Sequence, residues 1–482
     1  MNSVIRKELR KNPQILLNTL TSKIQQTEGQ FVVKSQLNTI SEKLAIESEK
    51  LEQRKILSRQ IGAAKKANED STHLITRVST ISAEINDIKQ EITDCVAIIE
   101  SEIAKNAENY ADSPQPLLPM HLRPYTETDS ATAFTGNHGE LTSCHDTTID
   151  LTMWQSFVRS TDHSTIYHDA RWKEIIEGNF KHQLYFLTCS DSDKKIAGLM
   201  PLVHLNSRLF GSFTTSMPWF NYGGPLATDL ATEESLMQQA AELSKKLGCS
   251  HMEIRETRGR TGWQSSQRKI SMILPLPDDD STLDASLGSK LRAQVNKARK
   301  NGLRVQFGGI EKLNEFYKVF SHNMRDLGTP VYGKKWFRDI LESFPDEAFI
   351  AVASLNGTPL AAGFLLGHKD KLEIPWASSI RRTNHLGANM LMYRAILDEA
   401  INRGYEFFDF GRSTREAATH RFKKQWGAKE HDLHWHYWTH DGYALPELNP
   451  DNPKFKLAIK LWQCMPVAIT RMIGPPVARN LP

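Results

Sequence analysis

Apolar side chains recur at helical spacing along the first hundred residues of the chain. From Leu74 to Ile99 they follow an alternating four-and-three spacing, and Leu37, Leu44 and Leu51 lie seven residues apart. This spacing is typical of a heptad repeat. Because a polar, turn-rich stretch separates the two runs, residues 1–110 are predicted to form an antiparallel helical hairpin, a coiled-coil arm.

The pattern changes after the arm. Residues 111–148 contain four prolines and few large apolar side chains, which predicts a flexible linker. Short strand-like runs then alternate with helical ones, so two consecutive α/β domains are expected at 149–275 and 276–440. An amphipathic tail at 441–482 is expected to dock on the body or to contact a membrane surface peripherally. The predicted fold class is α+β.

The clearest α/β signal lies between residues 372 and 428. An apolar run is followed by a basic loop, a helix that ends near Gly404, an aromatic strand and a second helix. A strand–helix–strand unit gathers its ligands at the carboxyl ends of the strands and the amino ends of the helices. The candidate chemistry is therefore expected in this stretch.

Asp409 lies in the aromatic strand and is the first candidate for proton removal or for orienting an amine. Burial of such a carboxyl group would raise its pKa. A structural ion pair with Arg412 explains the same residues equally well. Glu373, in the preceding strand, is the alternative carboxylate, and Arg412 is the third candidate catalytic residue. Ser413 fits a helix N-cap better than a nucleophile, since no serine lies in a G-x-S-x-G motif.

Composition narrows the possible function only slightly. The net charge is +4 and the pI is near 8.6, which is too mild to indicate a nucleic-acid partner by itself. The five cysteines form no C-x-x-C motif, and His434 and His436 fit a structural pair better than a metal site, so no metal is predicted. Without a long apolar run or a signal-peptide core, the expected location is the cytoplasm.

Two short sequence segments in the body resemble those of a known family. FDFGRS (408–413) and RFKKQWG (421–427) resemble the second acyltransferase domain of the Fem-type family, whose members are built from tandem GNAT-like domains. The likeness extends over about 154–438. Members of that family move an amino acid from aminoacyl-tRNA to an amine, and a FemAB-like branch associated with exopolysaccharide and protein-sorting loci is more similar still. The resemblance implies two GNAT-like domains here.

Cationic and aromatic residues in the body are the candidate substrate-binding groups. The helix-forming segment 289–305 carries six cations and no acid, which suits a polyanion but also fits an ordinary exposed helix. Asn221 and Tyr222 lie in an aromatic Gly-Gly turn that is equally well explained by packing. The resemblance extends to this turn, to the basic helix and to the loop with Tyr332. The full set is Asn221, Tyr222, Arg292, Arg299, Lys300, Tyr332, Lys423 and Lys424.

The arm carries a second resemblance. ELRKNPQILLNTL near the start and LSRQIGAAKKANED at the tip resemble the N-terminal arm of seryl-tRNA synthetase, which contacts the variable arm and elbow of its tRNA. On spacing alone, a dimerisation or spacer coiled coil is favoured. No class II synthetase motif follows, so the chain is not expected to charge tRNA. The candidate tRNA-binding residues, all cations near the tip, are Arg54, Lys55, Arg59, Lys65 and Lys66.

Together these features predict an aminoacyl-tRNA-dependent aminoacyltransferase that moves serine from seryl-tRNA to an amine or hydroxyl acceptor. The ester of the donor is already activated, so no cofactor is expected. One alternative is a GNAT enzyme that uses acyl-CoA. The spacing from Arg382 to Gly387 departs from the [Q/R]-x-x-G-x-[G/A] loop that binds the CoA diphosphate, which favours tRNA. Another alternative is a non-catalytic tRNA-binding scaffold.

Overall fold

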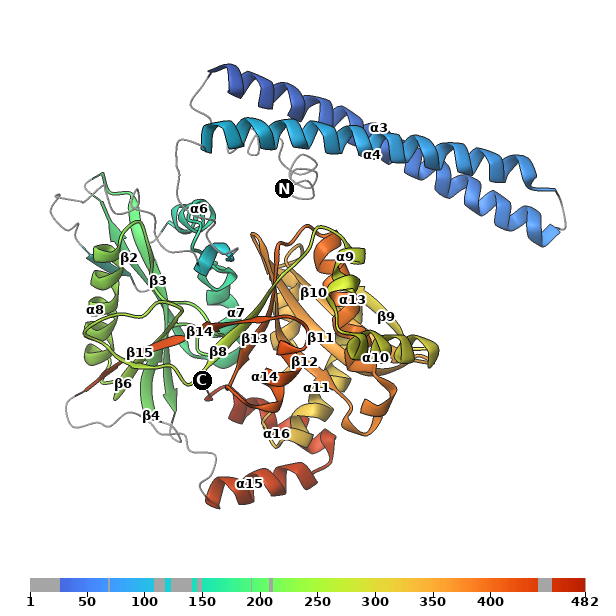
Figure 1. The fold of residues 1–482 in the computed structure, drawn as a ribbon. Helices are drawn as coiled ribbons and strands as arrows, with labels where there is room; N and C mark the ends of the chain where they lie inside the picture. Colours follow the sequence, from blue (N-terminus) through green and yellow to red (C-terminus); the bar gives the residue numbers. More distant parts are fainter. Residues whose placement is uncertain are drawn as a thin grey trace. The chain divides into compact units, whose positions relative to one another are not determined.

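The structure is a computed structural model of the chain, which divides into an N-terminal unit and a body (Figure 1). We describe each unit by itself. The described residues are 27–67, 70–107, 118–122, 141–144, 150–191, 193–207, 211–440 and 453–481.

The N-terminal unit contains two long helices, α3 (Thr27–Ala67) and α4 (Thr72–Ala107). The helices are antiparallel, because the ion pairs Lys43–Glu91 (2.5 Å) and Lys50–Glu84 (2.7 Å) join residues whose numbers rise on one helix and fall on the other. Apolar residues of both helices are buried between them, as the spacing in the sequence predicts. They include Leu37, Ile40, Leu44, Ile88, Ile92, Val96 and Ile99.

The predicted tRNA contacts lie toward the end of α3. Lys55 forms an exposed ion pair of 3.2 Å with Glu52, a type of contact that adds little to stability. Arg54 is half-buried. The side chains of Arg59, Lys65 and Lys66 lie outside the described part of the chain. Binding of tRNA by this unit stays a prediction.

The body is built on two sheets. The first has the strand order β1-β2-β3-β4-β6-β15-β7, with β5 paired to β3, and the second has the order β14-β8-β13-β12-β11-β10-β9. We call the parts built on them the first lobe and the second lobe. The strands of the first sheet are β1 (Leu141–Cys144), β2 (Gln183–Ser190), β3 (Ile196–Ser207), β4 (Gly211–Thr215), β5 (Leu226–Ala227), β6 (His251–Glu256), β7 (Gln264–Ser266) and β15 (His434–Thr439). Those of the second are β8 (Ile270–Pro275), β9 (Arg304–Gly308), β10 (Ala348–Leu355), β11 (Thr358–His368), β12 (Lys371–Ser379), β13 (Phe407–Ser413) and β14 (Lys429–Asp432).

Helices cover both sheets (Figure 1). In the first lobe, α8 packs on β2 and β3. In the second lobe, α11 and α12 pack on one face with one apolar core, and α10 and α13 pack with another. The body helices are α6 (Leu151–Ser160), α7 (Trp172–Phe180), α8 (Leu230–Lys246), α9 (Asp280–Ser286), α10 (Ser289–Lys300), α11 (Leu313–Leu327), α12 (Lys334–Ser343), α13 (Ala388–Asn402), α14 (Ala418–Lys424), α15 (Pro453–Cys464) and α16 (Val467–Ala478), with 3-10 turns η1 (Met120–Leu122), η2 (Ile166–His168), η3 (Ile310–Lys312) and η4 (Arg381–Leu386).

The mixed α+β architecture and the predicted βαβ unit are present, but the lobes do not follow the expected boundary after residue 275. β8 belongs to the second sheet although it precedes this boundary, and β15 belongs to the first sheet although it lies at the end of the second domain. Each lobe therefore takes one strand from the other's sequence. A single apolar core also contains residues of both lobes, among them Trp172 and Trp336, whose rings lie 5.8 Å apart.

Two described pieces of the expected linker pack on the body. β1 adds an antiparallel edge strand to β2. In η1 the Met120 amide donates a 2.9 Å hydrogen bond to Asp370, and the His121 ring contacts the Tyr222 ring edge-on at 4.9 Å. A proline-rich, polar segment cannot form a core of its own, but single side chains can still dock on an existing surface.

The two tail helices pack on α11. Arg471 donates to Ser321 Oγ at 2.8 Å, and Arg325 donates to the Met465 carbonyl at 3.0 Å. Their other faces expose apolar side chains, including Leu461 and Met472. None of the described helices combines the length and the apolar character needed to cross a bilayer. Peripheral membrane contact of this tail stays a prediction.

Candidate active site

The central strands of the second sheet separate at two carboxylates. β12 and β13 are parallel and pair over only three residues, of which the last pair is Glu373 with Asp409. Beyond this pair β12 continues along β11, while β13 continues along β8. The splay begins where the two side chains lie on the same face, because paired residues of adjacent strands point to the same side. Asp409 thus lies inside the strand rather than at its end.

Asp409 is completely buried and fully hydrogen-bonded. Its Oδ2 accepts from the Tyr222 hydroxyl at 2.6 Å, and its Oδ1 accepts from Ser271 Oγ at 2.9 Å and the Gly411 amide at 2.8 Å. Burial by itself would raise the pKa of Asp409, but the Lys371 charge and these hydrogen bonds outweigh it and lower the pKa. Asp409 is therefore a fixed anion, paired with Lys371 rather than with Arg412.

Glu373 is the carboxyl group whose properties suit proton transfer. Burial, reinforced by the Asp409 charge and opposed by Lys371, raises the pKa of Glu373 to about 7. Asn221 Nδ2 donates to Oε1 at 3.3 Å, whereas Oε2 accepts no hydrogen bond from the described residues. The Tyr167 hydroxyl lies near Glu373 without a well-aligned hydrogen bond among the described residues, and burial and the Glu373 charge raise the pKa of Tyr167. A base with a pKa near the working pH is the most effective one.

Lys371 lies between the two carboxylates and is not among the residues that the sequence predicted. Its Nζ lies 3.2 Å from Asp409 Oδ2 and 3.6 Å from Glu373 Oε2, and it stands over the Tyr222 ring at 4.3 Å. A signal was available, because Lys371 and Glu373 are two residues apart and residues at this spacing share one face of a strand. Tyr167 and Tyr222 also lie near these carboxylates, but they are too far away in the sequence to be found by spacing.

His121 covers this cluster from the η1 turn. Its Nε2 lies 3.4 Å from Lys371 Nζ, in addition to the ring contact with Tyr222. Burial and the Lys371 charge lower the pKa of His121, so the imidazole is neutral. A cavity of about 50 Å³ lies beside Tyr222 and Gly224, with room for about one water. His121 lines this cavity together with Tyr222.

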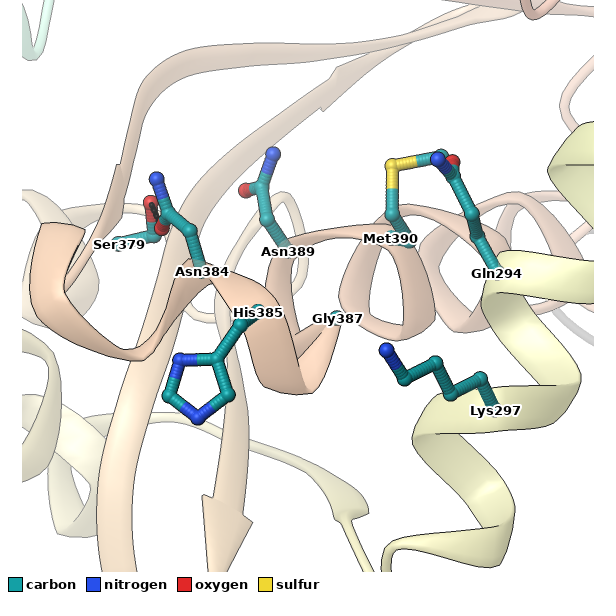
Figure 2. A pocket seen from close by; sticks show the side chains of 8 residues that line it. All are labelled: Gln294, Lys297, Ser379, Asn384, His385, Gly387, Asn389 and Met390. Carbon is teal, nitrogen blue, oxygen red and sulfur yellow. Dashed lines mark hydrogen bonds between the residues drawn. The ribbon is translucent and has the colours of Figure 1, made fainter.

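An open pocket lies at the other end of β12 (Figure 2). It has a volume of about 420 Å³ and is lined by Ser379, the η4 turn, the first turn of α13 and two side chains of α10. Gly387 has φ +79°, and a Cβ there would lie 3.2 Å from the Ala298 Cβ, so the helices meet closely at this point. Lys297 extends from α10 toward α13 and has no polar partner in the described part of the chain.

The start of α13 is suited to an anion. Its first intrahelical hydrogen bond runs from the Leu391 amide to the Gly387 carbonyl, so the preceding amides have no intrahelical acceptor. The first turn carries no acid. Helix N-termini bind phosphate because free amides and the helix dipole point at the ligand.

The other predicted substrate-binding residues lie in several places. Lys423 is buried and donates to the Gly411 and Arg412 carbonyls, both at 2.8 Å, and burial lowers the pKa of Lys423 to about 8. Lys424 is exposed near Glu430 at 3.6 Å. Arg292, Arg299 and Lys300 are exposed on α10 rather than at the carboxylates. Their roles stay predictions.

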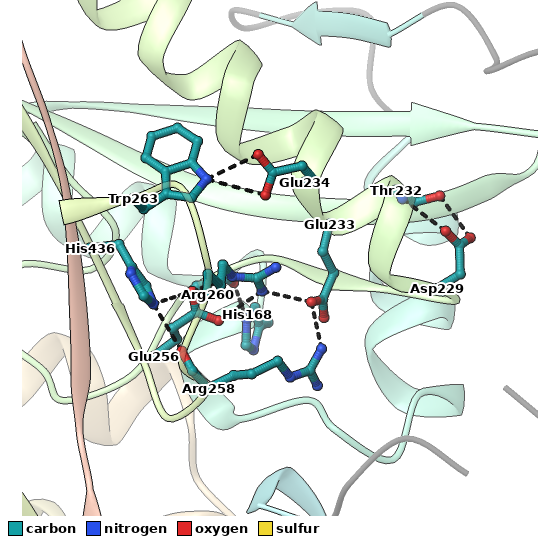
Figure 3. Close-up of polar contacts among 11 residues, drawn as sticks. His168, Asp229, Thr232, Glu233, Glu234, Glu256, Arg258, Arg260, Trp263 and His436 are labelled. Carbon is teal, nitrogen blue, oxygen red and sulfur yellow. Dashed lines mark hydrogen bonds and ion pairs between the residues drawn. The ribbon is translucent and has the colours of Figure 1, made fainter. Parts of the chain in front are cut away.

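The first lobe contains a network of charged side chains at the start of α8 (Figure 3). Glu233, in the first turn of α8, accepts from Arg258 at 2.7 Å and from Arg260 at 2.6 Å, and Arg260 also binds Glu256. Asp229 caps the same helix by accepting from the Thr232 amide. His436 is buried against the Arg258 carbonyl at 2.9 Å. No group of three potential metal ligands occurs among the described side chains.

Comparison with known proteins finds a domain family that matches most of the second lobe. The sequence model of the acetyltransferase (GNAT) domain family matches residues 286–439. Among solved structures, FemX is 13% identical, covers 66% of this chain and 100% of its own, and has a TM-score of 0.47. A tandem GNAT protein from the clavulanic acid biosynthesis pathway is 10% identical, covers 62% and 98%, and has a TM-score of 0.42. No curated protein matches the chain. The second lobe is thus similar to GNAT acetyltransferase domains, and acyl transfer is the chemistry that this similarity supports.

Proposed function

We propose that the second lobe transfers an acyl group from an activated donor to an amine or hydroxyl of an acceptor. The observation that carries the proposal is the pair Glu373 and Asp409 at the point where β12 and β13 separate, with Lys371 between them. Glu373 takes the proton from the acceptor nucleophile, which forms a bond to the acyl carbon. The bond from that carbon to the leaving group breaks, and Glu373 returns the proton to the leaving atom.

Asp409 and Lys371 keep Glu373 in the required state. The fixed negative charge of Asp409 contributes to the raised pKa of Glu373, and Lys371 limits that rise. Tyr222 and Asn221, which come from the first lobe, hold the two carboxylates in place. Acceptor binding displaces His121 from its position over Tyr222 and Lys371, which admits the nucleophile.

The donor places its phosphates at the start of α13, next to Lys297. Ser379 at this pocket and Glu373 are six residues apart on β12, which corresponds to roughly 20 Å at about 3.3 Å per residue. An extended donor that spans this distance brings its acyl carbon to the splay. Both an aminoacylated tRNA end and an acyl-CoA are extended phosphate-bearing donors, so the pocket alone suits either.

We further propose that the donor is an aminoacyl-tRNA, most specifically seryl-tRNA. The support is the likeness of the helical arm to that of seryl-tRNA synthetase and the exposed cations of α10, including Arg299 and Lys300. Phosphate contacts from such cations position a nucleic acid without reading its bases. The specificity for serine would then reside in the arm, which recognises the body of the tRNA.

The second candidate is acyl-CoA, which the pocket at Gly387 also suits. The left-handed Gly387 followed by the free amides of α13 offers backbone donors for a diphosphate, even though the loop departs from the usual spacing. An acetyl or longer acyl group would then occupy the space between β12 and β13. The reacting carboxylates would be the same.

Transfer from [14C]seryl-tRNA and from [14C]acetyl-CoA distinguishes the donors. The full chain is incubated with each donor and a mixture of small amines and cell extract, and labelled product is measured. Serine transfer that is weakened at least tenfold by R54E/K55E, but not by the arm control K34E, supports tRNA. Acetyl transfer that is indifferent to tRNA contradicts it, and no transfer from either donor contradicts the proposed function.

A further inference from the structure

A β-bulge at Gly411 places an arginine on the same face as the carboxylates. Asp409 is paired with Ile273 and Arg412 with Ser271, so three steps on β13 match two steps on β8. The extra residue reverses the usual alternation. Gly411 has φ +74°, and its amide binds Asp409 Oδ1 at 2.8 Å, so the same glycine fixes both the bulge and the carboxylate. Bulges of this kind are known to redirect side chains near active sites.

Residues on β8 confirm which face Arg412 occupies. Ser271 lies opposite Arg412 and donates to Asp409, so it belongs to the face of the carboxylates. Met272 and Leu274, at the alternate positions of β8, belong to the apolar core on the other face. Asp409 and Arg412 are thus separated by two strand positions of β8, or roughly 7 Å along the strand.

Arg412 is a cation without a carboxylate partner. No hydrogen bond or ion pair joins its side chain to the described residues, and it is the exposed residue of an otherwise buried strand. Its guanidinium lies 5.5 Å from the centre of the Trp435 ring, which Arg255 also contacts at 4.4 Å. The nearby Glu253 is already bound to Arg255 and Tyr437. Burial and the Arg255 charge, opposed by Tyr332 and Glu253, lower the pKa of Arg412 to about 10.

We propose that Arg412 binds an anionic oxygen group, a carboxylate or a phosphate, of the acceptor beside its nucleophile. The assignment deepens the proposed function, because it restricts the acceptor to molecules that carry such a group within roughly 10 Å of the reacting atom. A planar guanidinium binds carboxylates and phosphates through paired hydrogen bonds. The donor phosphates have a separate place at Lys297, so the two anions do not compete for one cation.

Anion binding tests the assignment without requiring catalysis. Inorganic phosphate and acetate are titrated into the full chain, and dissociation constants are measured by calorimetry or by 31P and 13C NMR. The variant is R412Q, and the matched control is R415Q, an exposed arginine that already pairs with Asp432 and Glu430. K297Q removes the second expected phosphate site. In the K297Q background, R412Q should weaken binding of at least one anion tenfold or more, and R415Q should leave both anions unchanged. Equal binding with and without Arg412 overturns the proposal.

A kinetic test separates this assignment from the proposed function. With an acceptor that the wild-type chain uses, R412Q should raise the KM for the acceptor at least tenfold and leave the KM for the donor unchanged, and R412K should restore part of the loss. A raised KM for the donor alone would assign Arg412 to the donor and overturn the proposal. If no acyl transfer occurs at all, the proposed function fails, while the dependence of phosphate or acetate binding on Arg412 still decides the anion site.

Discussion

The two lobes contain the same strand–helix–strand arrangement, but their helix starts border cavities of different size, about 50 Å³ beside Glu233 of α8 and about 420 Å³ at α13. In the first lobe β4 and β6 are parallel, pair over two residues and are joined through α8. In the second lobe β12 and β13 are parallel, pair over three residues and are joined through α13. Up to this point the architecture would permit the same chemistry in both.

In the first lobe, charged side chains occupy the end of the β4–β6 pairing and the start of α8. Beyond its short parallel pairing, Arg255 donates to the Phe220 carbonyl at 2.9 Å and to the Pro218 carbonyl. At the start of α8, Asp229 and Glu233 supply negative charges, which would repel a phosphate. The first turn of α13 has no acid and borders the 420 Å³ pocket.

The difference suggests that the two lobes have different roles. The loop that Arg255 holds in the first lobe also carries Asn221 and Tyr222, which bind the carboxylates of the second lobe. In the proposed function, the first lobe therefore supports the candidate site of its neighbour. Four experiments test this difference between the lobes.

The largest effect is expected for D409N. An amide in place of the carboxylate faces the three donors that bind Asp409 and removes the counter-charge of Lys371. Transfer activity should fall by about 10²- to 10⁴-fold. Steady-state kinetics measure the loss, and circular dichroism checks that the chain is folded. A folded D409N enzyme with activity within threefold of wild type would remove Asp409 from the site.

Removal of the arginine in the first lobe should mainly affect stability. R255M leaves two buried carbonyls and Glu253 without their donor, which should lower the free energy of unfolding by about 3–5 kcal/mol. Urea unfolding measures this change. R258M is the control and should cost less, because Glu233 keeps its bond to Arg260. Equal losses in both variants would show that Arg255 has no special part in holding the loop.

A charge change at each helix start compares the lobes directly. N389D adds a negative charge at the pocket of the second lobe and should raise the KM for the donor about tenfold, since it repels phosphate. D229N removes a negative charge at the start of α8 while keeping a capping side chain, and it should leave this KM unchanged. A donor effect of D229N, or none of N389D, would contradict the assignment of the donor to the second lobe.

Much of this fold was accessible from the sequence because its elements have clear periodicity. The apolar stripes of α3 and α4, the basic helix α10 and the strand with Asp409 lie where the spacing predicts them. The exchange of β8 and β15 between the sheets was not predictable, since no local pattern records which sheet a strand joins. The same holds for His121, a single side chain in a polar segment.

The contacts of the candidate site were also only partly predictable, because local sequence patterns do not show which strands meet. The sequence named Asp409 and Glu373 as candidates, and the structure pairs them on adjacent strands, but their catalytic roles stay predictions. The charged partner of Asp409 is Lys371, not Arg412. The letters FDFGRS do not reveal that Gly411 forms a bulge, because a glycine within a strand is compatible with regular pairing as well. The side to which Arg412 points therefore required the register of β8.

The pH dependence of transfer by wild type and E373Q shows whether Glu373 is the general base. Because the pKa of Glu373 is raised from its ordinary value near 4.5 to about 7, the base is protonated below pH 7. Wild-type kcat/KM should rise tenfold per pH unit up to about pH 7 and then level off, and E373Q should lack this limb and be about 10²- to 10⁴-fold slower.

The same pKa shift of Glu373 predicts how the stability of the chain depends on pH. The raised pKa means that protonated Glu373 is favoured in the folded chain, so its stabilising contribution is present below about pH 4.5 and is lost as the pH rises through 7. E373Q should therefore unfold at a higher temperature than wild type at pH 8 and at a similar temperature at pH 4.5. A loss of the pH 7 limb in E373Q is the result that the account predicts. An E373Q enzyme with wild-type rates and an unchanged pH profile would contradict it.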